Sequence, residues 1–166
     1  MTAMPPVVYL LCGLTGSGKT THAQRLEAAG AVRLTVDEEV HARHGRYGVD
    51  YPAAEYFERE QPVVEELRRR LVGLVESGHD VVFDHGLWRR SDRDAYKRLV
   101  EAHGGSWRVL YFKVDRNVLV RRLADRNRRD DANAMPLTAT DLDDFIARFD
   151  EPAGEGEEVV SSLPPA

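Results

Sequence analysis

The strongest constraint on the fold of this chain is a glycine-rich loop between an apolar run and a helical segment. Residues 7–12 (VVYLLC) are continuously apolar, as expected of a strand buried on both faces of a parallel sheet. They lead directly into residues 13–20 (GLTGSGKT), which match G-x-x-x-x-G-K-[ST] at every fixed position. The pattern that follows is helical and stops at Gly30. A chance glycine-rich turn is the weaker interpretation, because strand, loop and helix occur in the order that a phosphate-binding loop requires.

Each residue type in this loop suits a phosphate ligand. The glycines allow backbone angles that turn several N–H groups toward an anion, and the following helix adds the positive end of its dipole. Lys19 is expected to reach the β- and γ-phosphates of ATP, and the hydroxyl of Thr20 to bind Mg²⁺. The predicted nucleotide-binding residues of the loop are Gly13, Thr15, Gly16, Ser17, Gly18, Lys19, Thr20 and Thr21.

Patterns typical of strands and helices alternate along the rest of the chain. Apolar runs predict further strands at 32–36, 81–83, 107–113 and 158–161. Apolar spacing and capping residues predict helices at 61–77, from Ser91 to about His103, after Asp115 and at 142–149. Short helices and loops are expected at 38–58. The alternation predicts an α/β fold of three layers, with helices on both faces of a parallel sheet of about five strands.

Composition is that of an ordinary soluble domain. The chain has 166 residues, of which 42% are hydrophobic, and a formal net charge of −5. One domain over 1–166 is expected, with loose termini at 1–6 and 162–166. The negative charge disfavours nucleic acid as the main partner. With one cysteine no intrachain disulfide can form, and Cys12 reads as a small core residue. No leader or membrane-spanning stretch is visible, which predicts a cytoplasmic monomer or homodimer without membrane contact.

Two aspartates follow predicted strands, at the edge where ligands bind to a parallel sheet. Asp37 comes after the second strand and Asp84 after the third. Phosphoryl transfer needs one carboxylate near the attacking hydroxyl and one near the metal. Asp37 is the favoured base and Asp84 the favoured metal partner through water, although the reverse assignment is also open. Each aspartate alone could equally be a helix cap.

Arginines gather after the fourth predicted strand. Arg122, Arg126 and Arg129 lie on one helical face, where guanidinium groups could stabilise charge on a transferring phosphoryl group. Arg126 and Arg129 are therefore predicted catalytic residues, and Arg122 and Arg126 predicted nucleotide contacts. The alternative is a solvated face paired with neighbouring aspartates.

The acceptor pocket is expected between residues 38–60 and the turn after Asp84. Its predicted residues are Asp37, Tyr56, Asp84, His85, Arg89 and Arg93. Aromatic residues suit a ring-containing acceptor, and the two arginines suit an anionic one, but aromatic packing and a solvated loop explain these residues as well.

The segments that carry these features resemble one group of proteins. GLTGSGKT, VD (36–37), GHDVVFDHGLWRRSDRD (78–94), VRRLADRNRR (120–129) and FDEPAGEGE (149–157) are similar to the zeta-toxin, chloramphenicol-phosphotransferase and polynucleotide-kinase group of small P-loop kinases. The resemblance implies a five-stranded parallel sheet, ATP-dependent phosphorylation of a hydroxyl activated by Asp37, and an arginine lid at 122–129. It also implies that residues 149–157 lead to the last strand near the adenine, although the double proline common there is missing.

Several functions fit these features. The leading hypothesis is an ATP-dependent kinase for a hydroxyl of a nucleoside-, sugar- or antibiotic-like molecule. A polynucleotide 5′-hydroxyl kinase and a toxin that phosphorylates a sugar nucleotide are alternatives within the same chemistry. A nucleotide-hydrolysing switch or ATP-binding module is the alternative from another class, which Asp37 beside an acceptor-sized insertion disfavours.

Overall fold

A five-stranded parallel sheet lies at the centre of the protein, with the strand order β2-β3-β1-β4-β5. The structure is a computed structural model that describes residues 4–126 and 138–161, excluding the side chains of Arg126 and Ser161. The strands are β1 (Val7–Cys12), β2 (Val32–Thr35), β3 (Val81–Gly86), β4 (Ser106–Lys113) and β5 (Glu157–Ser161). Because β1 lies between β3 and β4, the loop after β1 leaves the sheet at the point where the strand order reverses. Ligands of open α/β sheets bind there.

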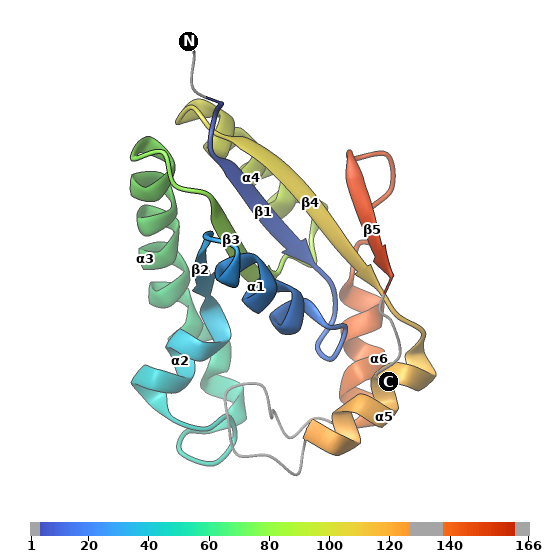
Figure 1. Cartoon of the computed structure of the whole chain (residues 1–166). Coiled ribbons are helices and arrows are strands. Elements are labelled where there is room, and N and C mark those ends of the chain that lie inside the picture. Colours follow the sequence, from blue (N-terminus) through green and yellow to red (C-terminus); the bar gives the residue numbers. More distant parts are fainter. Residues whose placement is uncertain (1–3, 127–137, 162–166) are drawn as a thin grey trace.

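Helices cover both faces of the sheet, as the alternating pattern predicts (Figure 1). Leu10 of β1 belongs to one core cluster with Leu67 and Leu71, whereas Leu11 belongs to another with Ala23. Successive residues of β1 therefore face opposite layers, which explains why its sequence is apolar without alternation. The helices are α1 (Lys19–Ala28), α2 (Val36–His44), α3 (Tyr56–Glu76), α4 (Arg90–Ala102), α5 (Arg116–Arg126) and α6 (Ala139–Arg148), with a short 3₁₀ turn at Ala53–Glu55.

The helices α5 and α6 form a small core of their own beside the phosphate loop (Figure 1). Leu119, Leu123 and Leu142 are almost fully buried in it, and Leu14 of the loop packs against them. The two helices and the loop are thus joined by apolar packing. A capping box between Thr138 and Asp141 starts α6, as predicted.

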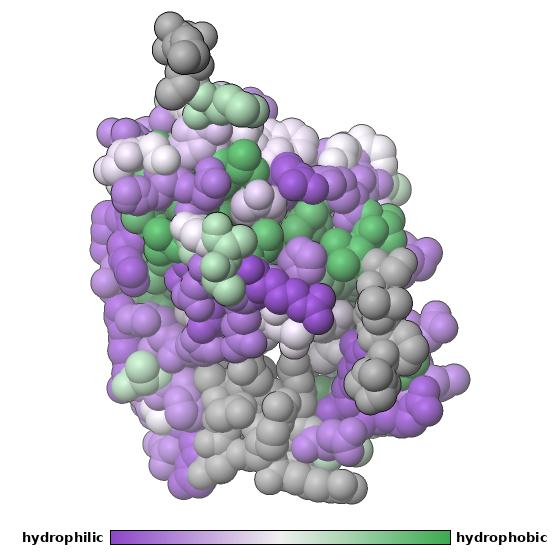
Figure 2. Space-filling view, in the orientation of Figure 1, coloured by the Kyte–Doolittle hydropathy of each residue, from purple (hydrophilic) through white to green (hydrophobic). Residues whose placement is uncertain are grey.

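The surface seen in Figure 2 is mostly hydrophilic, with hydrophobic residues between the polar ones over the strands. On β5 at the edge of the sheet, Val159 is 60% exposed. Within the described ranges, no helix combines the length and the apolar character needed to cross a lipid bilayer.

Three elements differ from the sequence-based expectation. The helix expected to begin at Gln61 begins at Tyr56 and continues through Pro62. The strand expected to end at Phe83 runs to Gly86, so Asp84 lies within it. The predicted capping box at Ser91 does not form, because the carboxylate of Asp150 accepts a hydrogen bond from the N–H of Arg90 at 3.1 Å and caps α4 from a distant segment.

Candidate functional site

The phosphate loop has the backbone geometry that its glycines predict. Gly16 and Gly18 adopt φ angles of 88° and 100°, in the left-handed region that glycine enters without strain. At Gly13 the restriction is space, because a Cβ there would lie 2.7 Å from Ser17 Oγ. The loop therefore needs glycine at these positions for two different physical reasons.

Two side chains in the loop are arranged to receive an anion. Lys19 Nζ donates to the carbonyl oxygens of Gly13 and Leu14 at 2.9 and 3.0 Å, which holds the ammonium group over the loop. Ser17 Oγ is buried, yet it has no hydrogen-bond partner within the described part of the chain. A buried hydroxyl without a partner is costly unless a ligand supplies one. The loop thus fits a phosphate group.

Asp84 lies next to the start of α1. Its side chain is almost fully buried, and Oδ2 accepts a hydrogen bond from Thr20 Oγ1 at 3.2 Å. Burial raises the pKa of Asp84, while the charge of Lys19 acts in the opposite direction. The strand β3 therefore delivers a carboxylate to the residue that the sequence assigns to the metal.

Asp37 lies in the first turn of α2 and is exposed, in contrast to Asp84. Its Oδ1 accepts a hydrogen bond of 2.6 Å from the hydroxyl of Tyr56, which belongs to α3. Burial and the charge of Asp37 raise the pKa of Tyr56 well above its ordinary value, so the phenol stays protonated and keeps donating. Asp37 also acts electrostatically on Asp84 and His85, which places all three at one edge of the sheet.

Glu60 belongs to the same group and was missed by sequence reasoning. It lies one helical turn after Tyr56 and interacts with the hydroxyl of that residue, and Glu60 Oε1 is 4.0 Å from His85 Nε2. Burial and the charge of Asp37 raise the pKa of Glu60 to about 7. The signal that could have revealed Glu60 is its i, i+4 spacing from Tyr56.

Arg93 does not belong to the acceptor pocket, and the expectation that it binds the acceptor is wrong. Its side chain is fully buried and forms a two-pronged ion pair with Glu155, at 2.8 Å from Nε and 2.7 Å from Nη2. Its Nη1 donates to the carbonyl of Leu87 at 2.9 Å. Leu87 has a φ angle of 43°, a strained value for a residue with a side chain. Arg93 therefore supports the turn after β3 from within the core.

The other predicted residues differ in how close the structure brings them to the loop. Arg122 Nη1 donates to the carbonyl of Gly16 at 2.9 Å, so the helix α5 reaches the phosphate loop directly. Arg89 and Thr21 are exposed, at the start of α4 and within α1, whereas Thr15 lies in the loop and is half-buried. The side chain of Arg126 and all of Arg129 lie outside the described residues, so both assignments stay predictions.

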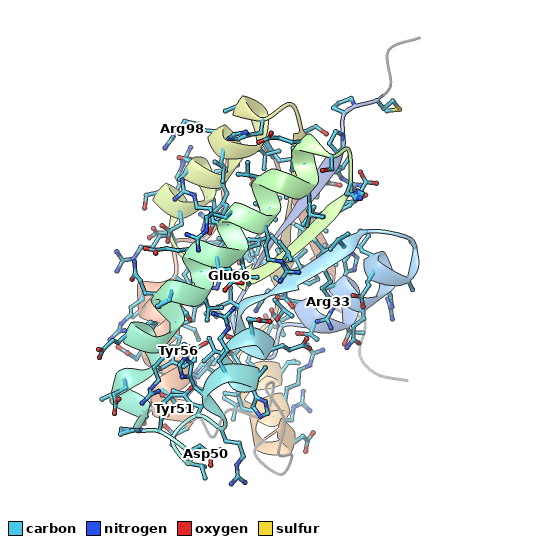
Figure 3. All side chains as sticks on the ribbon, turned by 90° about the vertical axis from the view of Figure 1, so that its left-hand side faces the viewer. Arg33, Asp50, Tyr51, Tyr56, Glu66 and Arg98 are labelled. Carbon is cyan, nitrogen blue, oxygen red and sulfur yellow. The ribbon has the colours of Figure 1, made fainter. Side chains whose placement is uncertain are left out.

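The tyrosines of residues 38–60 pack mainly on one another. Tyr47 lies edge-to-face with Tyr51 and Tyr56, at ring distances of 6.4 and 5.4 Å. Figure 3 shows Tyr51 and Tyr56 at the same end of the molecule, where the loop that carries Asp50 meets α3. Tyr51 and Tyr56 are buried, whereas Phe57 is 61% exposed. Aromatic packing therefore explains the two buried rings, and Phe57 alone among these rings offers a large free face.

Several solved structures share this architecture, and some of them are described as kinases. A gluconokinase from Sinorhizobium meliloti is 20% identical, with a TM-score of 0.65 over 98% of this chain and 86% of that one. A kinase described as putative, from Chloroflexus aurantiacus, is 17% identical, with a TM-score of 0.76 over 97% and 86%. The Pnkp1/Rnl/Hen1 complex matches at 17% identity and a TM-score of 0.60, over 74% of this chain and 40% of that one. These likenesses show a P-loop kinase-like fold.

Sequence comparisons place the chain in a family. No curated protein matches it significantly. The family model AAA_33, described as an AAA domain, matches residues 8–152, which include the phosphate loop, both aspartates and the helix α5. Because this match covers most of the chain, the protein is a member of the AAA_33 family of AAA domains.

Proposed function

We propose that this protein is an ATP-dependent kinase that transfers the γ-phosphate of ATP to a hydroxyl group of a small molecule. One observation carries the proposal. An exposed carboxylate, Asp37, and a buried one, Asp84, lie at the same edge of the sheet as Lys19, and each has its own hydrogen-bond partner. A bare nucleotide-binding module needs no exposed carboxylate oriented beside the phosphate loop.

The roles follow from the difference in burial. Asp37 is reachable from solvent and oriented by Tyr56, so it takes the proton as the acceptor oxygen attacks the γ-phosphorus and ADP leaves. Lys19 and the backbone N–H groups of the loop hold the phosphates in line with that oxygen. Arg122 would hold the phosphate loop in place from α5, through its hydrogen bond to Gly16. Arg126 and Arg129 are the candidates for stabilising the charge that develops on the transferring phosphoryl group.

The residues present also fit Mg²⁺. Thr20 Oγ1 and Asp84 Oδ2 are hard oxygen ligands 3.2 Å apart, which is the ligand type that Mg²⁺ prefers. Thr20 would bind the ion directly and Asp84 through water. The ion, when bound, neutralises charge on the phosphate oxygens.

Replacing Asp37 by asparagine should lower kcat by about 10²- to 10⁴-fold, because the amide keeps the size of the side chain but cannot accept the proton. The KM for ATP should change little, since Asp37 is placed toward the acceptor. Asp84→Asn should instead raise the Mg²⁺ concentration needed for half-maximal rate. Steady-state kinetics with varied ATP and Mg²⁺ measure both effects.

Asp94→Asn is the matched control, because Asp94 is a half-buried carboxylate on α4 that pairs with Arg90 and Lys97 of the same helix and has no assigned role in the site. This variant should leave kcat, the KM for ATP and the Mg²⁺ concentration for half-maximal rate unchanged. If Asp84→Asn abolishes transfer while Asp37→Asn preserves it, the two roles are reversed.

A screen of hydroxyl-bearing compounds with γ-labelled ATP tests the function itself. Single-stranded oligonucleotides with a 5′-hydroxyl belong in this screen, because the Pnkp1/Rnl/Hen1 complex shares the fold. A polynucleotide that neutralises several protein cations loses affinity steeply as salt rises, whereas a small acceptor does not. Transfer to oligonucleotides alone, with a KM that rises steeply with salt, would show that the protein is a polynucleotide kinase and not a small-molecule kinase.

A further inference from the structure

A second carboxylate, Glu60, interacts with the proposed base, and the proposed mechanism does not use it. Glu60 and Asp37 come from different helices, α3 and α2; the hydroxyl of Tyr56 donates to Asp37 Oδ1 at 2.6 Å and also interacts with the carboxyl group of Glu60. The side chain of Glu60 is 16% exposed, so the carboxylate is sheltered but still reachable. The carboxylates of Asp37 and Glu60 therefore lie close enough to interact electrostatically at the acceptor side of the phosphate loop.

The groups around Glu60 are acidic or neutral. Asp37 faces it from α2, and His85 faces it from β3 with Nε2 at 4.0 Å. Burial lowers the pKa of His85, which favours the neutral imidazole. Tyr51 and Tyr96 are further groups that interact with Glu60, and burial raises the pKa of both phenols.

The arginines nearest in sequence are directed elsewhere. Arg59 precedes Glu60 on α3, but its guanidinium lies 3.1 Å from His44 Nδ1 and 3.1 Å from Glu55 Oε1. Arg93 is fully buried against Glu155. Lys19 acts on His85 and Asp84, on the phosphate side of the group. Asp37 therefore places a second negative charge beside Glu60, whereas the guanidinium groups of Arg59 and Arg93 pair with other carboxylates.

We propose that Glu60 binds a second hydrogen-bond donor of the acceptor, a hydroxyl or amino group next to the hydroxyl that Asp37 activates, and that it excludes acceptors with an anionic group at that position. This inference rests on the proposed kinase function. It differs from the sequence-based expectation of an anionic acceptor, which depended on Arg89 and Arg93. Arg93 is buried in the core, whereas the role of Arg89 stays a prediction. A carboxylate accepts hydrogen bonds from neutral and cationic donors alike, and it repels a second carboxylate or a phosphate. The acceptor class is a neutral polyol, nucleoside or amino alcohol.

Matched acceptors that differ by one acidic group test the inference. Suitable pairs are glucose and gluconate, glycerol and glycerate, and adenosine and adenosine 3′-phosphate, whose 5′-hydroxyl is free in both members. The wild-type protein should transfer phosphate to the neutral member of a pair with a kcat/KM at least about tenfold higher, the difference arising mainly in KM.

The variant Glu60→Gln keeps the size of the side chain and removes its charge. The neutral-to-acidic ratio of kcat/KM should fall about tenfold toward one, while the KM for ATP stays unchanged. Glu65→Gln is the matched control, because Glu65 is exposed on the same helix and the change in net charge is identical. It should keep the wild-type ratio.

The pH dependence gives a second measurement that a merely structural role would not change. The pKa of Glu60 is about 7, so its carboxyl group is mostly neutral at pH 6 and mostly charged at pH 8. For the glucose–gluconate and glycerol–glycerate pairs, whose carboxylates stay ionised over this range, discrimination against the acidic member should therefore rise from pH 6 to pH 8 in the wild type and stay flat in Glu60→Gln.

The possible failures are distinguishable. Preferred transfer to the acidic members, or a ratio that Glu60→Gln leaves unchanged, overturns the role of Glu60 and leaves the kinase function standing. If no member of the three pairs and no other hydroxyl compound accepts phosphate, both the kinase function and the inference are overturned.

Discussion

Replacing Lys19 by alanine should lower phosphoryl transfer by about three orders of magnitude while leaving the protein folded. In the structure the ammonium group is already held over the loop by two carbonyl oxygens, at 2.9 and 3.0 Å, before any nucleotide binds. Removing it takes away a preorganised charge from the phosphates. Alanine is a good helix former and α1 begins at this residue, so the fold should lose little. Initial rates with γ-labelled ATP measure the loss, and thermal unfolding followed by circular dichroism measures the fold.

Lys113→Ala is the control for this result, because Lys113 is 65% exposed at the end of β4 and pairs with the exposed Glu151. Its turnover should equal that of the wild type. A Lys19→Ala protein that is folded and turns over at a near-normal rate would contradict the assignment of the phosphate loop.

The second large effect concerns stability. Arg93→Ala or Glu155→Ala should lower the free energy of unfolding by about 3–5 kcal/mol, because each removes the main counter-charge of a buried ion. After Arg93→Ala, Glu155 keeps only the longer contact of 3.7 Å with Lys97 Nζ among the ion pairs of the described residues. The side chains of Arg93 and Glu155 are 0% and 1% exposed, and two hydrogen bonds of 2.8 and 2.7 Å join them. Urea unfolding of the purified variants measures the change.

The pair Arg108–Glu158 offers a control of similar chemistry. It is also two-pronged, but its side chains are 49% and 46% exposed. Arg108→Ala should therefore cost no more than about 1 kcal/mol. The double variant Arg93→Met/Glu155→Leu should recover much of the loss, since it removes both buried charges together. If Arg93→Ala costs no more than Arg108→Ala, the core pair does not stabilise the fold.

The sheet and the phosphate loop could be predicted from the sequence because their signals are local. An apolar run of six residues ends directly at a glycine pattern, and the strand, the loop and the helix are contiguous in the chain. The sheet of five parallel strands agrees with that expectation, and the buried Cys12 does too. Strand bounds were placed less well, because charged residues such as Asp84 do not signal that pairing continues through them.

Residues that depend on distant partners could not be predicted. Arg93 resembles a surface arginine in its local context, and only the return of the chain 62 residues later brings Glu155 against it. The start of α4 is capped by Asp150, 60 residues away, which made the local capping box at Ser91 irrelevant. Glu60 could not be predicted because the expected helix starts after it, at Gln61. In the structure α3 starts at Tyr56, which puts Tyr56 and Glu60 one turn apart on the same helix.

The separation of Arg93 from Glu155 also bears on how the chain folds during its synthesis. Arg93 leaves the ribosome 62 residues ahead of its partner, which corresponds to about 3–12 s at ordinary rates of translation. During that interval the chain completes β1, β3 and α4. The guanidinium group of Arg93 on α4 still lacks Glu155, so it favours contact with water. The nascent chain can collapse around its central strands, but it reaches its tightly packed state only when Glu155 arrives and the last strand adds to the sheet.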